Sequence, residues 1–220
     1  SSIAHDIRTP LTVIQGQIDL IQDLRKLDHF DVTPHLEIIR KNCGKMTMLT
    51  DNLSLLYKVE NDHFSLNGKE VDVRQILEEK KLEISTMVYH QKSINICFDV
   101  NLQKSSYILD EAMLMRVLDN ILYNSLRFTK SGEIKLEVHD EKEGNECKIY
   151  FRCSDTGMGF KENDTSLLFQ PFYQDKQYKN HVGLGLYIAK RIVNHHGGEI
   201  WAYNNEKGGA TVEFYIKELS

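Results

Sequence analysis

The stretch that organises the rest of the chain is EAMLMRVLDNILYNSLRF, residues 111–128. Its apolar side chains recur every three or four residues, which predicts an amphipathic helix with one buried face. The opposite face carries Asn120, Asn124 and Arg127. Asparagine stabilises a helix interior poorly, so two of them four residues apart indicate a task other than helix formation. Two carboxamides and a guanidinium on one face can hold a phosphate and its Mg²⁺, although a solvated polar face is the plainer explanation.

A second candidate site follows the strand predicted at residues 147–153, where the sequence continues as DTGMGF. Gly157 and Gly159 would let the backbone approach a flat ligand closely. Asp155 can accept a hydrogen bond from an exocyclic amine of such a ligand. The pattern alone is weak, because most loops of this composition are only turns.

A third cluster lies in VGLGLYIAKRIV, residues 182–193. It places Gly183 and Gly185 at the start of an amphipathic helix, where free backbone amides bind phosphate. The stretch between the second and third clusters contains FQPFYQ. It is longer than ordinary loops, which is typical of a mobile active-site lid.

Around these clusters the hydrophobic periodicity predicts a domain of alternating helices and strands. We expect helices at 72–90, 111–128 and 184–196, and strands at 94–100, 133–139, 147–153, 199–204 and 210–216. Helices combined with mostly antiparallel strands favour a two-layer α/β sandwich. The segment HFSLNGK before them breaks the helical period and marks a domain boundary.

The first sixty residues carry two coiled-coil-like apolar stripes on either side of the polar break LDHFDVT. Pro34 suits the first turn of the second helix, with Thr33 as its N-cap. A two-helix hairpin cannot enclose its own stripes, whereas two copies complete a four-helix bundle, so we expect a homodimer. The predicted class is α+β, with the hairpin at residues 1–62 and the sandwich at residues 64–220. The stripes are Ile3, Ile7, Leu11, Ile14, Ile18 and Ile21, then Leu36, Ile39, Cys43, Met46, Leu49, Leu53 and Leu56.

His5 points away from the first of these stripes. Asp6 is its neighbour, and Thr9 follows one turn later on the same outer face. Pro10 removes the amide that would bond the Asp6 carbonyl, so we expect a loosened or kinked turn. This combination favours a functional histidine, and a solvated surface histidine is the alternative.

Composition excludes several classes of protein. The chain has 220 residues, with 27 Lys and Arg against 32 Asp and Glu, a formal net charge of −5. This mild acidity argues against non-specific nucleic-acid binding. No run approaches the roughly 18 apolar residues of a membrane span, so we expect no membrane contact by this fragment. Four cysteines without metal-ligand spacing are expected to be reduced and buried.

Taken in order, these segments resemble the motifs of two-component sensor histidine kinases. AHDIRTPLT resembles their H box, LDNILYNSLRF the N box, DTGMGF the G1 box, FQPFYQ the F box and HVGLGLYIAKRIV the G2 box. HGGEIWAYNNEKGGATVEFYI is similar to their terminal glycine-containing hairpin. The resemblance covers essentially the whole chain. It implies a histidine-phosphotransfer hairpin of the HisKA type followed by a Bergerat-type ATP-binding domain.

The resemblance also implies a role for each candidate residue. His5 matches the phosphoacceptor, Asp6 the acidic residue that assists it as base, and Thr9 the residue that positions water during dephosphorylation of a regulator. Asn124 matches the Mg²⁺ ligand, and Asp155 matches the carboxylate that reads adenine. The full set implied to hold ATP is Asn120, Asn124, Arg127, Asp155, Gly157, Gly159, Phe169, Phe172, Gly183, Leu184 and Gly185.

The implied activity is that of an ATP-dependent protein-histidine kinase. It would transfer phosphate from Mg-ATP to His5 and then to an aspartate of a response regulator, and it would dephosphorylate that regulator. The chain lacks an initiator Met and begins inside a periodic helix, so we expect a fragment, the cytoplasmic portion of a plasma-membrane sensor kinase.

Two departures from the family pattern leave alternatives open. The G2 box commonly reads GxGLGL with Thr or Ser second, whereas His181 and Val182 precede Gly183 here. Phe160 replaces the commoner small aliphatic residue after G1. One alternative is a related ATPase of the chaperone or mismatch-repair kind. The other is a non-catalytic dimeric scaffold that binds nucleotide.

Overall fold

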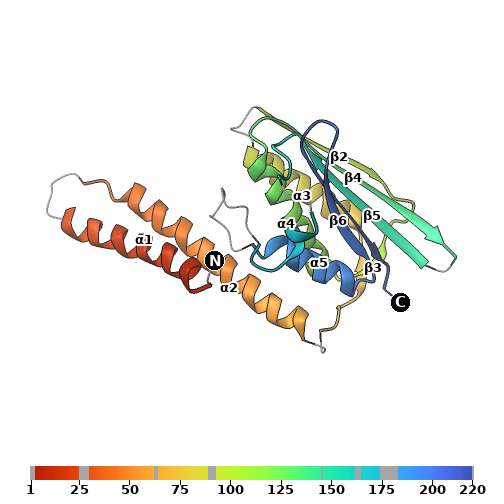
Figure 1. Ribbon diagram of the computed structural model, residues 1–220, viewed down its shortest axis with the longest axis horizontal. Coiled ribbons are helices and arrows are strands. Elements are labelled where there is room, and N and C mark those ends of the chain that lie inside the picture. The colour runs from red at the N-terminus through yellow and green to blue at the C-terminus, as the bar shows by residue number, and fades with distance from the viewer. Residues whose placement is uncertain are drawn as a thin grey trace.

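The computed structural model describes residues 3–24, 30–61, 64–88, 93–144, 146–161, 165–173 and 183–219. Figure 1 shows two parts: a long helical hairpin, and a sheet covered on one face by helices. The second helix of the hairpin runs to the helical face of the sheet domain. The predicted α+β architecture is confirmed.

The hairpin consists of α1 (Ile3–Leu24) and α2 (Thr33–Glu60), which pack against each other along their length. In Figure 1 the N-terminal end of α1 is the end nearer the sheet domain. The helix α1 continues through Pro10, which is its buried residue. The hydroxyl of Thr9 donates to the His5 carbonyl at 3.0 Å, which adds a bond in the turn where proline removes one.

The start of α2 differs from the predicted cap. Thr33 is the first helical residue, and its amide donates to Asp31 Oδ1 at 2.9 Å. The prediction of Thr33 as N-cap was therefore wrong, because a carboxylate two residues earlier takes its amide. Pro34 does lie in the first turn, as expected.

The sheet has the strand order β2-β4-β5-β7-β6. Its strands are β2 (Ile94–Asn101), β4 (Gly132–Glu143), β5 (Glu146–Asp155), β6 (Glu199–Asn204) and β7 (Ala210–Lys217). β2 and β4 are parallel, and every other pair is antiparallel. One face is covered by α3 (Val73–Val88), α4 (Glu111–Phe128) and α5 (Gly185–His195), which gives the predicted two layers (Figure 1).

Three short elements were not predicted. β1 (Lys69–Val71) and β3 (Tyr107–Leu109) form a separate antiparallel pair, and a 3₁₀ turn labelled η1 spans Thr165–Phe169. Three to five residues are too few to show a period.

The core lies between the sheet and its three helices, because alternate strand residues point to that face. Phe151 on β5 and Phe214 on β7 stack there with ring centroids 4.5 Å apart. Leu55 and Val59 of α2 join the same apolar cluster, so the end of the hairpin is packed into the sheet domain. Of the cysteines, Cys147 and Cys153 are buried, Cys97 is half-buried and Cys43 is exposed, so the prediction of burial was wrong for Cys43.

Candidate nucleotide and phosphoacceptor sites

Asp155, at the end of β5, has a carboxylate held by backbone amides. It is 5% exposed. Its Oδ1 accepts from the amides of Gly157 at 2.9 Å and Ala210 at 3.1 Å. No residue that the structure describes donates to Oδ2. The carboxylate is therefore fixed in orientation, with one oxygen left for a ligand.

Asn205 supports this clamp, and sequence reasoning missed it. Its Nδ2 donates to the Asp155 carbonyl at 2.9 Å and to the Ala210 carbonyl at 3.1 Å. Its Oδ1 accepts from the amides of Lys207 and Gly209. Asparagine at the head of the turn NEKGG was the available signal, because its side chain readily bonds backbone two residues on.

The glycines after Asp155 have a different packing reason from the one predicted. A Cβ at Gly157 would lie 2.5 Å from the carbonyl oxygen of Phe128, the last residue of α4. Gly159 has φ +66°, and a Cβ there would meet Asn204 and Gly208 at 2.7 Å. These close approaches are to the protein's own backbone and turn, so the glycines bring β5, α4 and the β6–β7 turn together.

The polar face of α4 meets the start of α5. A Cβ on Gly185 would lie 2.9 Å from Asn120 Oδ1. Asn120 Nδ2 is buried and has no hydrogen-bond partner in the described ranges. A buried amide donor without a partner is costly, and a phosphate oxygen would satisfy it. Asn124, one turn further along α4, is half-buried.

The first turn of α5 has no side-chain cap. Leu184 precedes it with helical dihedral angles and provides no side-chain cap. The backbone amides of this turn therefore need partners from outside the helix. An N-terminus in this state favours phosphate binding, and a phosphate site at Gly183 and Gly185 stays a prediction.

The two aromatic residues predicted for the lid both pack against the apolar core. Phe169 is buried, with the Lys190 ammonium 5.5 Å from its ring centroid. Phe172 has φ 63° and packs against the core. A Cβ at Gly183 would lie 2.2 Å from the Tyr173 carbonyl, which leaves room only for glycine. His181 and Val182, the unusual start of the G2 box, lie outside the described residues.

These residues fit an adenine nucleotide with its metal. Asp155 offers a fixed acceptor, Asn120 a buried unpartnered donor, and α5 a set of amides. No group of three or more His, Cys, Asp or Glu side chains within the described ranges has metal-binding geometry. Mg²⁺ commonly takes its ligands from phosphates, water and one or two protein oxygens, which the Asn124 carboxamide can supply.

Arg127 extends this polar face at the end of α4. Its guanidinium lies 5.4 Å from the Phe128 ring, and desolvation lowers its pKa below the ordinary value without removing its charge at neutral pH.

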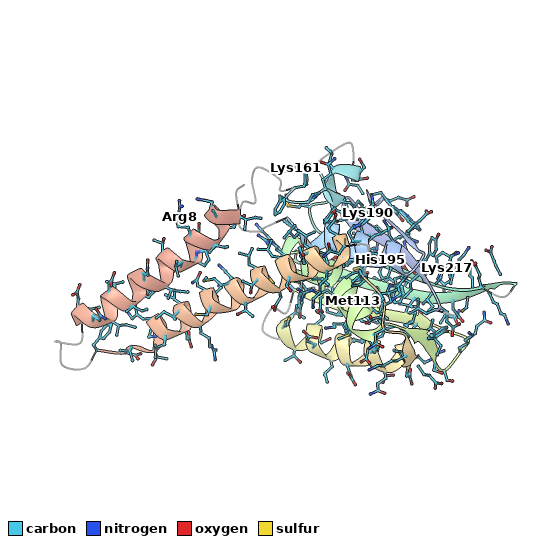
Figure 2. All side chains as sticks on the ribbon, turned by 90° about the horizontal axis from the view of Figure 1, so that it is seen from below. Arg8, Met113, Lys161, Lys190, His195 and Lys217 are labelled. Atoms are coloured by element: carbon cyan, nitrogen blue, oxygen red, sulfur yellow. The ribbon has the colours of Figure 1, made fainter. Side chains whose placement is uncertain are left out.

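The candidate phosphoacceptor lies on the other part of the molecule. His5 and Thr9 are exposed and Asp6 is half-buried, all in the first turns of α1. Figure 2 shows Arg8, in the same turns, on the hairpin and away from Lys161 and Lys190 of the sheet domain. The candidate phosphoacceptor and the candidate nucleotide residues therefore lie on different parts of the chain, the hairpin and the sheet domain.

A polar interface that the sequence did not predict joins the two parts. Arg116 on α4 donates from Nη2 to Asn52 Oδ1 on α2 at 2.6 Å. On α5, Arg191 forms an ion pair with Glu60 at 3.1 Å, and His195 Nε2 lies 3.1 Å from the Val59 carbonyl. Figure 2 shows His195 beside the C-terminal end of α2.

Comparison with known proteins gives two family matches. Residues 1–62 match the His Kinase A (phospho-acceptor) domain. Residues 109–220 match the family described as histidine kinase-, DNA gyrase B-, and HSP90-like ATPase. Among curated proteins, the sensor histidine kinase WalK of Bacillus subtilis (strain 168) is 28% identical over 226 residues, which cover 98% of this chain and 36% of WalK. The chain thus spans about a third of that relative.

Solved structures show the same fold. Full-length ShkA, in complex with AMPPNP, aligns with a TM-score of 0.74 at 20% identity, covering 98% of this chain and 45% of ShkA. Histidine kinase ThkA, in complex with response regulator protein TrrA, aligns with a TM-score of 0.68 at 22% identity, covering 99% of this chain and 60% of the ThkA chain.

None of the helices described is long and apolar enough to cross a membrane. The matched hairpin and ATPase domain together show that this chain belongs to the two-component histidine kinases and contains their catalytic core.

Proposed function

We propose that this chain transfers a phosphoryl group from Mg-ATP to His5 and then to an aspartate of a response regulator. One observation supports the proposal above all. His5 is exposed on the hairpin, and the sheet domain carries a fixed acceptor at Asp155 and a buried unpartnered donor at Asn120. The proposal takes residues 1–62 as the dimerising phosphotransfer unit and residues 64–220 as the ATP-binding unit.

In this mechanism His5 is the nucleophile. Neutral imidazole attacks through one ring nitrogen, so a P–N bond forms while the P–O bond to ADP breaks. A hydrogen bond from the other nitrogen to the Asp6 carboxylate would fix the tautomer and stabilise the cation that develops. Bound Mg²⁺ supplies neutralisation of the phosphate charge.

The remaining candidates hold the nucleotide. Asp155 Oδ2 accepts from the adenine amine, because Oδ1 is already committed to two amides. Asn120 Nδ2 and the first amides of α5 bind phosphate oxygens, and Arg127 adds positive charge at the end of the same face. Asn124 offers its carboxamide oxygen to the metal. Phe169, which is buried, and Phe172, which packs against the core, are the aromatic residues of the proposed lid.

The wider roles extend from the same assignment. We propose a homodimer, because both stripes contain exposed apolar side chains in the single chain, such as Leu11 at 42% and Leu36 at 53%. We also propose that Thr9 orients water during dephosphorylation of the regulator, and that the core works on the cytoplasmic side of a plasma-membrane sensor kinase. WalK, a sensor histidine kinase, and the ThkA–TrrA complex support a regulator as partner.

Incubation with γ-labelled ATP and Mg²⁺ tests the proposal. We expect label on the protein that is lost in acid and retained in base. His5→Gln should abolish it while leaving ATP affinity unchanged, whereas His139→Gln, at an exposed histidine of the sheet, should leave it intact. Free phosphate without labelled protein would favour the ATPase alternative. The absence of both free phosphate and labelled protein would favour the scaffold alternative. Normal labelling of His5→Gln would refute the assignment.

A further inference from the structure

A buried lysine lies behind the nucleotide face of α4. Lys80 on α3 is 3% exposed and is the one lysine or arginine that is buried within the described ranges. Its ammonium donates to Glu83 at 2.5 Å and to Asp119 on α4 at 2.7 Å. Tyr123, one turn after Asp119, donates its hydroxyl to the other oxygen of Glu83. These four side chains, the Lys80 cluster, link α3 to α4 through hydrogen bonds and ion pairs, beside the apolar core that both helices share.

A gain in stability is a weak reason for this cluster, because Lys80 is buried while Glu83 and Asp119 remain partly exposed. A buried ion pair costs desolvation free energy, and replacing it with apolar side chains is often neutral or stabilising. Burial alone would lower the pKa of Lys80, yet its bonds to Asp119 and Glu83 outweigh this and hold the pKa above its ordinary value. The ammonium therefore stays charged at neutral pH, and its bonds persist.

The positions of the cluster residues on α4 indicate which neighbouring side chains the cluster holds in place. Asp119 and Tyr123 are four residues apart and form one row along the helix, and Asn120 and Asn124 form the next row, about 100° round the axis. Each asparagine thus directly follows a residue that the cluster holds. Apolar packing of the opposite face tolerates small rotations, whereas directional bonds of 2.5–2.7 Å do not.

We propose that Lys80 is a positioning residue for the nucleotide site: by holding Asp119 directly and Tyr123 through Glu83, it sets the rotation of α4 and so aims Asn120 and Asn124. The inference rests on the proposed function of these two asparagines. Asp155 belongs to β5 and is held by other bonds, so the adenine contact does not depend on Lys80.

This division gives a test with a readout other than activity. Binding of a fluorescent ATP analogue is measured with EDTA and then across a Mg²⁺ titration. Lys80→Met should weaken binding of the Mg²⁺-free nucleotide only slightly, through the Asn120 contact, but should need about tenfold more Mg²⁺ for half of the metal-dependent gain in affinity, as for other residues that orient metal ligands. Tyr123→Phe removes only one hydroxyl and should shift the titration in the same direction by a smaller factor.

Two controls separate positioning from folding. Lys81→Met changes an exposed neighbour on α3 and should match the parent throughout. Lys80→Arg keeps the charge and should recover part of the Mg²⁺ dependence. Parent-like Mg²⁺ titrations for both Lys80→Met and Tyr123→Phe would overturn the inference while the proposed function stands. A parent that binds no Mg-ATP would refute the proposed function, and the inference with it.

Discussion

Replacing Asp155 by asparagine should change which base the site prefers. The amides of Gly157 and Ala210 both donate to Oδ1, at 2.9 and 3.1 Å. In the variant the carbonyl oxygen must take that position, because an amide nitrogen there would face two donors. The new NH₂ group then occupies the position of Oδ2 and meets the adenine amine, donor against donor.

The expected loss can be worked out from that geometry. An unsatisfied buried polar group costs about 1–3 kcal/mol, which corresponds to roughly 5- to 150-fold weaker ATP binding. Guanine has a carbonyl acceptor where adenine has its amine, so GTP binding should weaken less or improve. The ratio of ATP to GTP affinity should therefore fall. The two amide bonds lose charge assistance as well, which should lower the free energy of unfolding by roughly 2 kcal/mol.

Fluorescence titration with labelled ATP and GTP measures the ratio directly. Asp140→Asn is a matched control, because Asp140 is also buried and accepts from the Gln103 amide and the Tyr107 hydroxyl. It should lose stability but keep the base preference. An unchanged ATP to GTP ratio in Asp155→Asn would refute the adenine assignment, whatever happens to stability.

Three further outcomes are expected. Light scattering should give about twice 25.5 kDa for this chain, and Leu11→Glu with Leu36→Glu should return it to the monomer mass because both side chains are exposed on the hairpin; a monomeric parent would contradict the dimer. Thr9→Ala should keep autophosphorylation and alter stability by no more than roughly 0.5 kcal/mol, but slow the decay of phosphorylated regulator, and equal decay rates would remove that role. Burial lowers the pKa of His196 below 6.5, so the native state takes up this proton at lower pH than the unfolded chain does. The free energy of unfolding measured in urea should therefore be constant above about pH 6.5 and decrease at lower pH. His196→Gln should remove this pH dependence, and parallel pH curves for the two proteins would disprove the effect.

The elements with a long period were predictable from sequence. α4 begins and ends at the predicted residues 111 and 128, and its start is reinforced because Asp110 accepts from the Met113 amide at 3.1 Å. β6 also has its predicted bounds, 199–204. Both have side-chain patterns that repeat over several residues, and such patterns are the signal that local sequence carries.

Contacts between distant segments could not be predicted in this way. Arg116 and Asn52 are 64 residues apart, and Lys80 and Asp119 are 39 apart. Such pairs have no periodic signature, because their geometry exists only after the helices pack. The glycines show a related limit. The sequence predicted that Gly157 lets the backbone approach a ligand closely, whereas the close neighbour in the structure is the Phe128 carbonyl.

The contact between α2 and α5 has a mechanical consequence. Tyr187, Arg191 and His195 are spaced four residues apart, so they lie along one flank of α5, and each contacts Val59 or Glu60. While these contacts hold, α2 cannot twist or slide without carrying α5 with it. The leading end of α5 is Gly185, beside Asn120. A rotation of α2 would therefore move α5 as a rigid body and shift Gly185 relative to Asn120, without deforming the sheet.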